Sequence, residues 1–303
     1  MKTYLVTGGA GFIGSHLVDA LVKRGHRVLV VDNLSGGRKE NLNPKARFYK
    51  ADICEFKTIK PLFAGVDVVF HLAAIPRVPV SMKDPVGTSR VNILGTINVF
   101  KAAAEAKVKK VIFASSSSVY GNQKTSPLQE SMVPGPLSPY ALQKLVGEQT
   151  AKLFTAIYRV PIISLRYFNV YGPRIDFDSD YSLVMGKFLK LKSLKKPLTI
   201  FGDGKQTRGF CYIDDVVSAN MKAAQSGKVQ GGDIINVGSA KSYSVNFLAQ
   251  LMGGKVLHLP KRAGDVLHTK ADISKAKKLL GWQPRVPLEE GLKKVQAWFD
   301  SIK

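Results

Sequence analysis

Short apolar runs alternate with stretches of helical periodicity along the first half of the chain. Between the runs at 2–7 and 27–31, apolar residues such as Leu17 and Leu21 recur at the spacing of one helix face. Further runs of strand length follow at 46–51, 66–71, 110–115 and 161–166. Strands that alternate with helices are typical of a parallel sheet covered on both faces. The pattern predicts an α/β fold built on a doubly wound parallel sheet.

A glycine-rich turn joins the first predicted strand to the first predicted helix. Gly8 permits a tight turn, Gly11 allows the main chain to approach a pyrophosphate, and Gly14 allows helix and strand to pack closely. The amide groups and the positive dipole end of the helix favour phosphate. A strand, glycine turn, helix and second strand in this order predict a dinucleotide site.

An acidic residue ends the second predicted strand. Asp32 lies 18 positions after Gly14, where its carboxylate can accept hydrogen bonds from the hydroxyls of an adenosine ribose. A 2′-phosphate would meet like charge there, so NAD is favoured over NADP. Arg38 nearby leaves that choice open, because a cation could accommodate the extra phosphate.

Polar and small residues follow several of the predicted strands. The carboxyl ends of parallel strands meet at one edge of a sheet, where ligands bind. We therefore expect three segments to converge on one crevice: 52–53, 72–74 and 115–118.

A tyrosine and a lysine stand four positions apart just after a predicted helix start. Ser138 is a typical N-cap and Pro139 suits the first turn, so Tyr140 and Lys144 lie on one helix face. A free tyrosine has a pKa of about 10, and a neighbouring ammonium lowers it toward the range of a useful base. The spacing also occurs by chance, in which case the pair is a half-buried tyrosine and a surface charge. Ser116, at a strand end, is the candidate hydrogen-bond partner for the hydroxyl whose proton such a base would remove.

Composition narrows the class of protein without choosing its function. The 303 residues are 45% hydrophobic and 22% charged, as in ordinary globular proteins, and the two cysteines suggest neither a disulfide framework nor a metal site. No segment suggests a signal peptide or a membrane span, so we expect a cytoplasmic protein. The net charge of +23 favours anionic partners, but no nucleic-acid motif accompanies it. We expect a solvated lysine-rich surface and no specific nucleic-acid partner.

Several motifs together resemble one enzyme family. They are Thr7–Gly14, Asp32–Leu34, His71–Ala74, Asn92–Gly95, Ser115–Gly121, Tyr140–Lys144, Leu165–Arg174 and Gly202–Arg208. The chain resembles, over nearly its whole length, an extended short-chain dehydrogenase/reductase of the NAD-dependent epimerase/dehydratase family. Within that family it is most similar to UDP-glucose and UDP-N-acetylglucosamine 4-epimerases. The resemblance implies a Rossmann fold with a smaller substrate-binding domain.

The resemblance also assigns site residues. It implies a catalytic group of Ser116, Tyr140 and Lys144, and no metal ligands. The residues implied to contact NAD are Gly8, Gly11, Phe12, Ile13, Gly14, Asp32, Asn33, Asp52, Ile53, Leu72, Ala73, Ala74, Asn92, Ser115, Tyr140, Lys144, Tyr167 and Phe168. Those implied to contact the UDP-sugar are Ser117, Ser118, Asn169, Phe201, Arg208, Arg262, Asp265 and Thr269.

The segment before Val119 distinguishes between the reactions that members of this family catalyse. Dehydratases and decarboxylases of this family place an acid there, whereas this chain has Ser116–Ser118. The resemblance therefore implies a 4-epimerase of UDP-glucose and UDP-galactose, of their N-acetyl forms, or of both. In this reaction Tyr140 takes the C4 hydroxyl proton, hydride passes to NAD, and hydride returns to the other face of a transient 4-keto sugar. A UDP-uronate epimerase, another nucleotide-sugar oxidoreductase and a non-catalytic NAD-binding regulator are the alternatives.

Three positions bear on the sugar. Thr269 stands where a bulky residue narrows the pocket in relatives, so N-acetylated sugars are expected to fit. Gly209 replaces the usual aspartate after Arg208, which puts the anchoring of that arginine in doubt. Arg77 replaces a small residue near the sugar, so an acidic sugar is conceivable.

The same resemblance predicts the domain organisation. Residues 1–170, with 211–240 returning to them, are expected to form the NAD-binding domain, and 171–210 with 241–303 the substrate-binding domain. Relatives dimerise through paired helices, so 91–104 and 140–154 are candidate interface segments of a homodimer.

Overall fold

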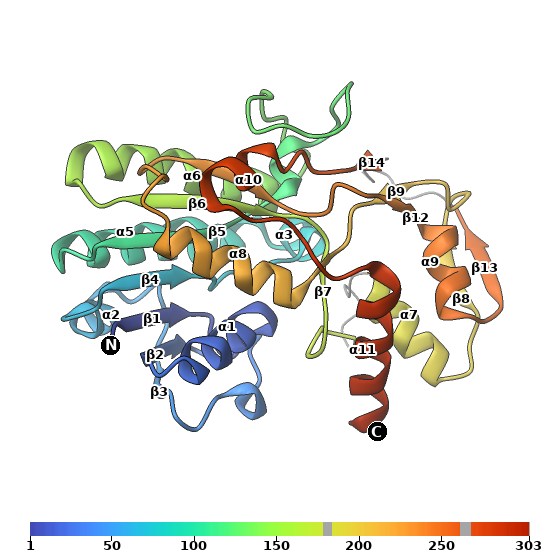
Figure 1. Cartoon of the computed structure of the whole chain (residues 1–303), viewed down its shortest axis with the longest axis horizontal. Coiled ribbons are helices and arrows are strands. Elements are labelled where there is room, and N and C mark those ends of the chain that lie inside the picture. Colours follow the sequence, from blue (N-terminus) through green and yellow to red (C-terminus); the bar gives the residue numbers. More distant parts are fainter. Residues whose placement is uncertain (178–183, 261–267, 303) are drawn as a thin grey trace.

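A parallel sheet forms the centre of the molecule in this computed structural model, which describes residues 1–177, 184–260 and 268–302 (Figure 1). Its seven strands in the described part of the chain run in the order β11-β6-β5-β4-β1-β2-β3. Their bounds are β1 (Thr3–Thr7), β2 (Arg27–Asp32), β3 (Arg47–Lys50), β4 (Val68–His71), β5 (Lys110–Ser116), β6 (Ile162–Tyr167) and β11 (Ile234–Val237). The predicted α/β doubly wound sheet of the Rossmann type is confirmed.

Helices cover both faces of this sheet because its strands alternate two sets of apolar side chains. Tyr4 and Val6 pack into one core, whereas Leu5 between them packs into the other. The first face carries α1 (Phe12–Lys23), α8 (Ile213–Gln225) and, beside β11, α10 (Ser274–Leu280). The second carries α2 (Phe56–Ile59), η2 (Lys60–Phe63), α5 (Thr96–Glu105) and α6 (Pro139–Tyr158).

Short helices and strands lie at the carboxyl edge of the sheet, where the predicted site residues are expected. They are η1 (Lys39–Asn41), α3 (Val78–Lys83), α4 (Pro85–Ser89), the π-helical turn η3 (Arg90–Gly95), the 3-10 turn η4 (Ser117–Tyr120), and the paired strands β7 (Val170–Tyr171) and β10 (Cys211–Tyr212). The chain between η4 and α6 projects from the body as a long loop (Figure 1).

A smaller lobe lies beyond that edge. It contains α7 (Val184–Ser193), β8 (Leu198–Phe201), β9 (Thr207–Arg208), β12 (Tyr243–Ser244), α9 (Val245–Met252), β13 (Val256–Leu259) and β14 (His268–Thr269), with α11 (Leu288–Ser301) running alongside. β12, β9 and β14 form one small sheet, and β8 pairs with β13 in another. None of the described helices is long and apolar enough to cross a membrane.

Candidate active site

The glycine turn brings main chain very close to main chain. Gly8 has φ +72°, and a Cβ there would lie 2.7 Å from the Ala73 nitrogen. A Cβ on Gly14 would lie 2.1 Å from the Gly8 carbonyl oxygen. Glycine is therefore required at both positions, and helix α1 begins at Phe12 with its first amides at the carboxyl edge of β1. Phe12 and Ile13 thus supply the amides of a helix start suited to a diphosphate.

Asp32 is held at the end of β2 by main-chain donors. Its carboxylate accepts hydrogen bonds from the Ala10 nitrogen at 3.0 Å and the Leu34 nitrogen at 2.8 Å. Each carboxylate oxygen retains a lone pair for a ribose hydroxyl. The Arg38 guanidinium lies 5.8 Å from the centre of the Phe177 ring. The Asp32 carboxylate is thus an acceptor suited to the hydroxyls of an unphosphorylated ribose.

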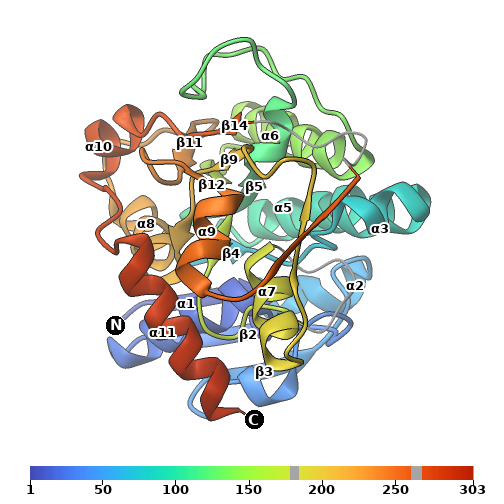
Figure 2. The ribbon, with the colours of Figure 1, turned by 90° about the vertical axis from the view of Figure 1, so that its right-hand side faces the viewer.

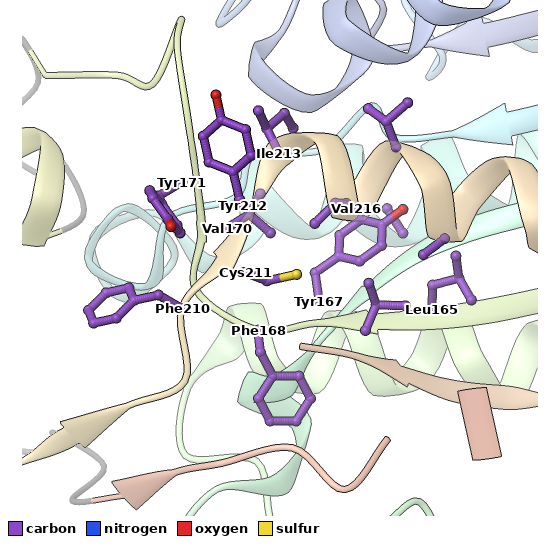
Figure 3. Packing of buried hydrophobic residues seen from close by; sticks show 14 of the residues in the cluster. Leu165, Tyr167, Phe168, Val170, Tyr171, Phe210, Cys211, Tyr212, Ile213 and Val216 are labelled. Carbon is purple, nitrogen blue, oxygen red and sulfur yellow. The ribbon is translucent and has the colours of Figure 1, made fainter. Parts of the chain in front are cut away.

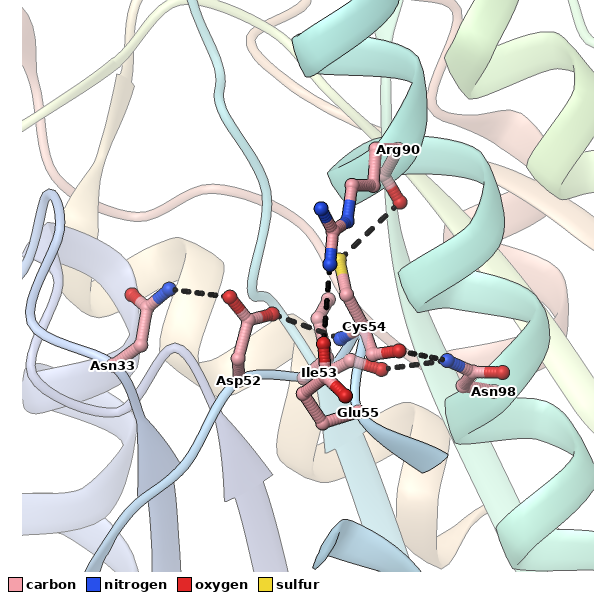
Figure 4. Close-up of polar contacts among 7 residues, drawn as sticks. All are labelled: Asn33, Asp52, Ile53, Cys54, Glu55, Arg90 and Asn98. Atoms are coloured by element: carbon pink, nitrogen blue, oxygen red, sulfur yellow. Dashed lines mark hydrogen bonds and ion pairs between the residues drawn. The ribbon is translucent and has the colours of Figure 1, made fainter. Parts of the chain in front are cut away.

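A second carboxylate organises the turn after β3 (Figure 4). Asp52 accepts from the Cys54 nitrogen at 2.8 Å and from the Asn33 side chain at 3.2 Å. Burial raises the pKa of Asp52, but the hydrogen bonds from Cys54 and Asn33 outweigh it and leave the pKa lowered. Asn98 of α5 donates to the Ile53 and Cys54 carbonyls at 3.0 Å each, which ties the turn to that helix. The turn thus presents an ionised acceptor beside the end of β3.

The segment after β4 is fastened from two directions. The Ala73 nitrogen donates to the Thr7 hydroxyl at 3.3 Å, which keeps 72–74 against the glycine turn. Asn92 of η3 exchanges two hydrogen bonds with the Ile75 main chain, at 2.8 and 3.1 Å, and donates to Gln143 of α6 at 2.7 Å. The Asn92 amide is therefore engaged in holding this loop to α6.

Helix α6 begins as its sequence predicts. The Ser138 hydroxyl accepts from the Ala141 nitrogen at 3.2 Å, and Pro139 occupies the first turn. The Tyr140 nitrogen donates to the buried Ser81 hydroxyl at 3.0 Å, so α3 helps to set where the helix starts. Tyr140 is consequently placed by two independent hydrogen bonds near its main chain.

Tyr140, Lys144 and Ser116 lie together at the carboxyl edge of β5. The Lys144 ammonium donates to the Ala114 carbonyl at 2.8 Å and lies 5.9 Å from the centre of the Tyr140 ring. Ser116 ends β5, and its hydroxyl is within hydrogen-bonding reach of Tyr140. Three segments far apart in the sequence thus place a phenol, an ammonium and a hydroxyl in one spot.

Burial dominates the electrostatics of this group. It raises the pKa of Tyr140, while the hydrogen bond with Ser116 and the charge of Arg77 act in the opposite direction. Burial also lowers the pKa of Lys144, to about 8. We expected a tyrosine pKa below its usual value; the protein alone does not produce it, because desolvation of the phenolate outweighs both favourable contacts. A further positive charge beside the phenol is required.

The other serines of this segment have different surroundings. Ser118 donates to the Ser116 hydroxyl at 2.9 Å, and Ser117 precedes it at the start of η4. The Ser115 hydroxyl turns inward and donates to Glu148 at 2.5 Å. Glu148 forms a fully buried ion pair with Arg166 at 2.7 Å. Ser115 therefore has only its main chain to offer a cofactor.

Tyr167 and Phe168 also direct their side chains into the core (Figure 3). The Tyr167 hydroxyl donates to Asn220 of α8 at 2.8 Å, and the Phe168 ring packs against Gly238. Any contact of these two residues with a cofactor would use main-chain atoms.

Three of the predicted substrate residues, Asn169, Arg208 and Thr269, lie together at the small sheet β12-β9-β14 of the second lobe. Asn169, with φ +35°, donates to the Gly209 carbonyl at 3.2 Å and to the Thr269 hydroxyl at 3.0 Å. Phe201 ends β8, with the Lys187 ammonium 5.0 Å from its ring centre. Arg262 and Asp265 lie outside the described residues.

Arg208 is held although Gly209, and not an aspartate, follows it. A Cβ on Gly209 would lie 3.0–3.3 Å from the carbonyl oxygens of Ser239, Thr269 and Lys241, so the neighbouring main chain would have to shift by a few tenths of an ångström to admit a side chain. Arg208 is placed instead by the pairing of β9 with β12 and β14, and by a hydrogen bond to the Thr207 carbonyl at 3.0 Å.

An ion pair spans the two loops beside Tyr140. Arg77, just before α3, lies 2.8 Å from Asp176, which follows β7. Both side chains are partly buried. The pairing places a guanidinium with its own counter-ion near the phenol.

Three residues near the site were not predicted from the sequence: Ser81, Gln143 and Asp176. Gln143 was recognisable in principle, since it lies on the same helical turn as Tyr140 and Lys144. Ser81 and Asp176 carry no local signal, because their partners are distant in sequence.

Comparison with known proteins gives consistent similarities. The model of the NAD dependent epimerase/dehydratase family matches residues 4–238. The structure is similar to that of the UDP-glucose 4-epimerase of Thermotoga maritima with UDP-glucose, at 39% identity, TM-score 0.95 and coverage of 99% of both chains. It is similar to the UDP-N-acetylglucosamine 4-epimerase of Methanobrevibacter ruminantium M1 in complex with UDP-N-acetylmuramic acid, at 38% identity and TM-score 0.95, covering 100% of this chain and 99% of that one.

A third similarity is to the UDP-glucuronic acid 4-epimerase of Bacillus cereus in complex with UDP-glucuronic acid and NAD. The identity is 36%, the TM-score 0.91, and the coverage 99% of this chain and 100% of that one. The three relatives share C4 epimerisation in their names and differ in the sugar.

Proposed function

The chain belongs to the NAD-dependent epimerase/dehydratase family, and from that premise we propose that it is a 4-epimerase of UDP-hexoses. The substrates would be UDP-glucose and UDP-galactose, their N-acetyl forms, or both pairs. NAD is the cofactor of the family.

The observation that carries this proposal is the meeting of Ser116, Tyr140 and Lys144. The ammonium lies 5.9 Å from the phenol ring and is buried, so water does not screen it. Bound NAD supplies an acceptor and then a donor of hydride, and its positively charged ring favours the phenolate. Tyr140 removes the C4 hydroxyl proton and returns it, while Ser116 orients that hydroxyl. Gly11, Phe12, Ile13, Asp32 and Asp52 would hold the dinucleotide.

The surroundings of Tyr140 argue against dehydration or decarboxylation. Those reactions need a second acid or base, but the segment before Val119 contains only serines. The nearest carboxylate on α6, Glu148, is locked in its ion pair with Arg166 and turned into the core. In this proposal, proton transfer is carried out by the Tyr140 phenol alone.

Arg77 is the residue that favours a uronate substrate, but its ion pair with Asp176 weakens this argument. Asp176 already neutralises the guanidinium at 2.8 Å. A uronate carboxylate would have to displace Asp176 to gain the charge. Neutral hexoses avoid this exchange, and the small Thr269 leaves space for an N-acetyl group.

Incubation with separate UDP-sugars tests the proposal. UDP-glucose, UDP-N-acetylglucosamine and UDP-glucuronate would each be supplied with catalytic NAD, and products resolved by chromatography. We expect the C4 epimer of a neutral sugar and no accumulation of NADH. Exclusive turnover of the uronate would establish the alternative, and no turnover of any sugar would favour a non-catalytic NAD-binding protein.

We also propose a homodimer and a cytoplasmic location. Helix α6 carries exposed apolar residues at Leu153, Ile157 and Tyr158, which two paired copies would cover. We also propose the domain boundaries predicted from the sequence. Residues 1–170 and 211–240 would bind NAD, and residues 171–210 and 241–303 would bind the substrate.

A further inference from the structure

The outer end of the second lobe combines exposed lysines with exposed aliphatic side chains. We call the set the distal basic surface; it consists of Lys192, Leu194, Lys195, Lys196, Leu251, Lys255, Val256 and Leu257. Leu194 is 53% exposed, Leu257 49%, Val256 42% and Leu251 38%. Figure 2 looks onto this end of the molecule, with α7 and α9 in front.

Tertiary contacts make one surface from two distant segments. β8 and β13 run parallel, with Leu198 opposite Val256, and the Leu198 nitrogen donates to the Lys255 carbonyl at 2.7 Å. The Lys192 ammonium donates to the Met252 carbonyl at the end of α9, at 2.5 Å. Residues 192–197 and 253–258 are all exposed. The basic end of α7 and the outer strand β13 therefore lie side by side.

The charge of these segments is of one sign. Residues 184–202 and 243–260 contain six lysines and no aspartate or glutamate. Lysines dispersed over an ordinary surface alternate with acids, which limits their combined field. The four exposed lysines of this surface, Lys192, Lys195, Lys196 and Lys255, have no acidic residue within their own segments, so the surface attracts an extended anionic partner.

The aliphatic residues decide which anionic partner fits. Single-stranded nucleic acid binds by stacking on aromatic rings, and the described residues of the distal basic surface include no exposed aromatic side chain. A second copy would bring a second cationic face and meet like charge. A membrane with anionic lipids offers phosphates to the lysines and an apolar boundary to the leucines, and clusters of four to eight basic residues are typical of such binding. We propose that the distal basic surface binds the protein peripherally to anionic membranes.

Sedimentation with lipid vesicles tests this inference. Full-length protein would be mixed with vesicles of phosphatidylcholine alone or with about one third phosphatidylglycerol. We expect binding only to the anionic vesicles, weakened by high salt because the Debye length shortens. Reversing Lys195, Lys196 and Lys255 to glutamate should lower the partition coefficient by at least about 100-fold, at roughly fivefold per lysine.

A matched control distinguishes an effect of the distal basic surface from an effect of the net charge of the protein. Lys2→Glu, Lys45→Glu and Lys57→Glu together change the net charge equally, at exposed positions in the sheet domain. This variant should retain most of the binding. Leu194→Ser with Leu257→Ser should weaken binding while leaving its salt dependence intact.

Several outcomes would overturn the inference. They are equal losses in the two charge-reversed variants, equal binding to neutral vesicles, and binding to an RNA oligonucleotide that vesicles do not compete. Thermal unfolding of each variant distinguishes loss of the surface from loss of the fold.

Discussion

At the scale of single residues, Tyr140 is a phenol that its own protein environment makes less acidic. Burial raises its pKa, and the contacts with Ser116 and Arg77 only reduce that effect. If Tyr140 is the base, as we propose, it therefore needs positive charge from the ring of the bound cofactor in addition to that of Lys144.

Tyr140→Phe removes the proton acceptor while preserving the ring. We expect turnover to fall by about 10²- to 10⁴-fold, the usual contribution of a positioned general base. NAD binding, measured by fluorescence titration, should change little. Ser116→Ala, which keeps the phenol, should give a smaller loss; a Tyr140→Phe enzyme of normal activity would refute the site.

The buried ammonium of Lys144 is predicted to reduce the stability of the fold, although its proposed role is to stabilise the Tyr140 phenolate. Burial lowers its pKa from 10.5 to about 8, so the unfolded chain holds its proton more tightly. The resulting penalty is fully present below pH 8, amounts to about 3 kcal/mol, and is relieved as pH rises toward 10.5. Lys144→Met should thus unfold at a higher temperature at pH 7, despite losing the bond to Ala114.

The same substitution should abolish most activity, because the phenolate loses its neighbouring charge. Differential scanning calorimetry at pH 7 and pH 10 measures the effect, and the gain over the wild type should shrink at the higher pH. A variant less stable than the wild type at pH 7 would show that the ammonium contributes more than its burial costs.

At the scale of elements, His71 joins two strands to a helix. It hydrogen-bonds with Thr7 of β1 at 2.7 Å and with Thr96 of α5 at 3.0 Å. Burial lowers the pKa of His71 to about 3, so the ring is neutral in the folded protein.

This neutrality predicts acid sensitivity. The unfolded chain binds the proton at pH values below about 6.5, so stability from this group is lost as pH falls from 6.5 toward 3, by up to about 5 kcal/mol. Chemical denaturation at several pH values should show a shallower acid loss for His71→Gln. The exposed His268→Gln should retain the wild-type slope, and identical slopes for all three proteins would exclude His71 as the cause.

Element boundaries were predictable where local chemistry defines them. The Ser138 cap is confirmed, and the strands at 27–31 and 110–115 appear within a residue or so of their expected ends. Helix α1 begins at Phe12, so the end of the glycine turn, including Gly14, is part of the helix. The two-residue strands of the second lobe were beyond prediction, since pairing with distant partners defines them.

At the scale of the whole molecule, the proposed dimer surface on α6 and the distal basic surface both depend on how helices and strands are arranged in space. The exposed apolar residues of α6 lie on the helix that also carries Tyr140 and Lys144, so association would cover the far side of that helix. The distal basic surface lies on the other lobe.

Ile157→Asp should disrupt the proposed dimer. A buried unpaired carboxylate at the interface costs several kcal/mol, so light scattering after gel filtration should report a monomer. Val133→Asp, at an exposed position outside α6, should leave the mass unchanged. A wild-type protein that is monomeric at high concentration would contradict the proposal directly.

The sequence by itself determined the parts whose physics is local. Glycine is required where main chains touch, an N-cap must precede its helix, and a spacing of four aligns Tyr140 with Lys144. The alternation of strands and helices then left one fold class.

Only the tertiary structure decided which side chains face the crevice. It turned Ser115, Tyr167 and Phe168 into the core, paired Arg77 with Asp176, and joined 192–197 to 253–258. Such contacts depend on strand register and loop paths, to which residues distant in sequence contribute jointly. No local pattern encodes them.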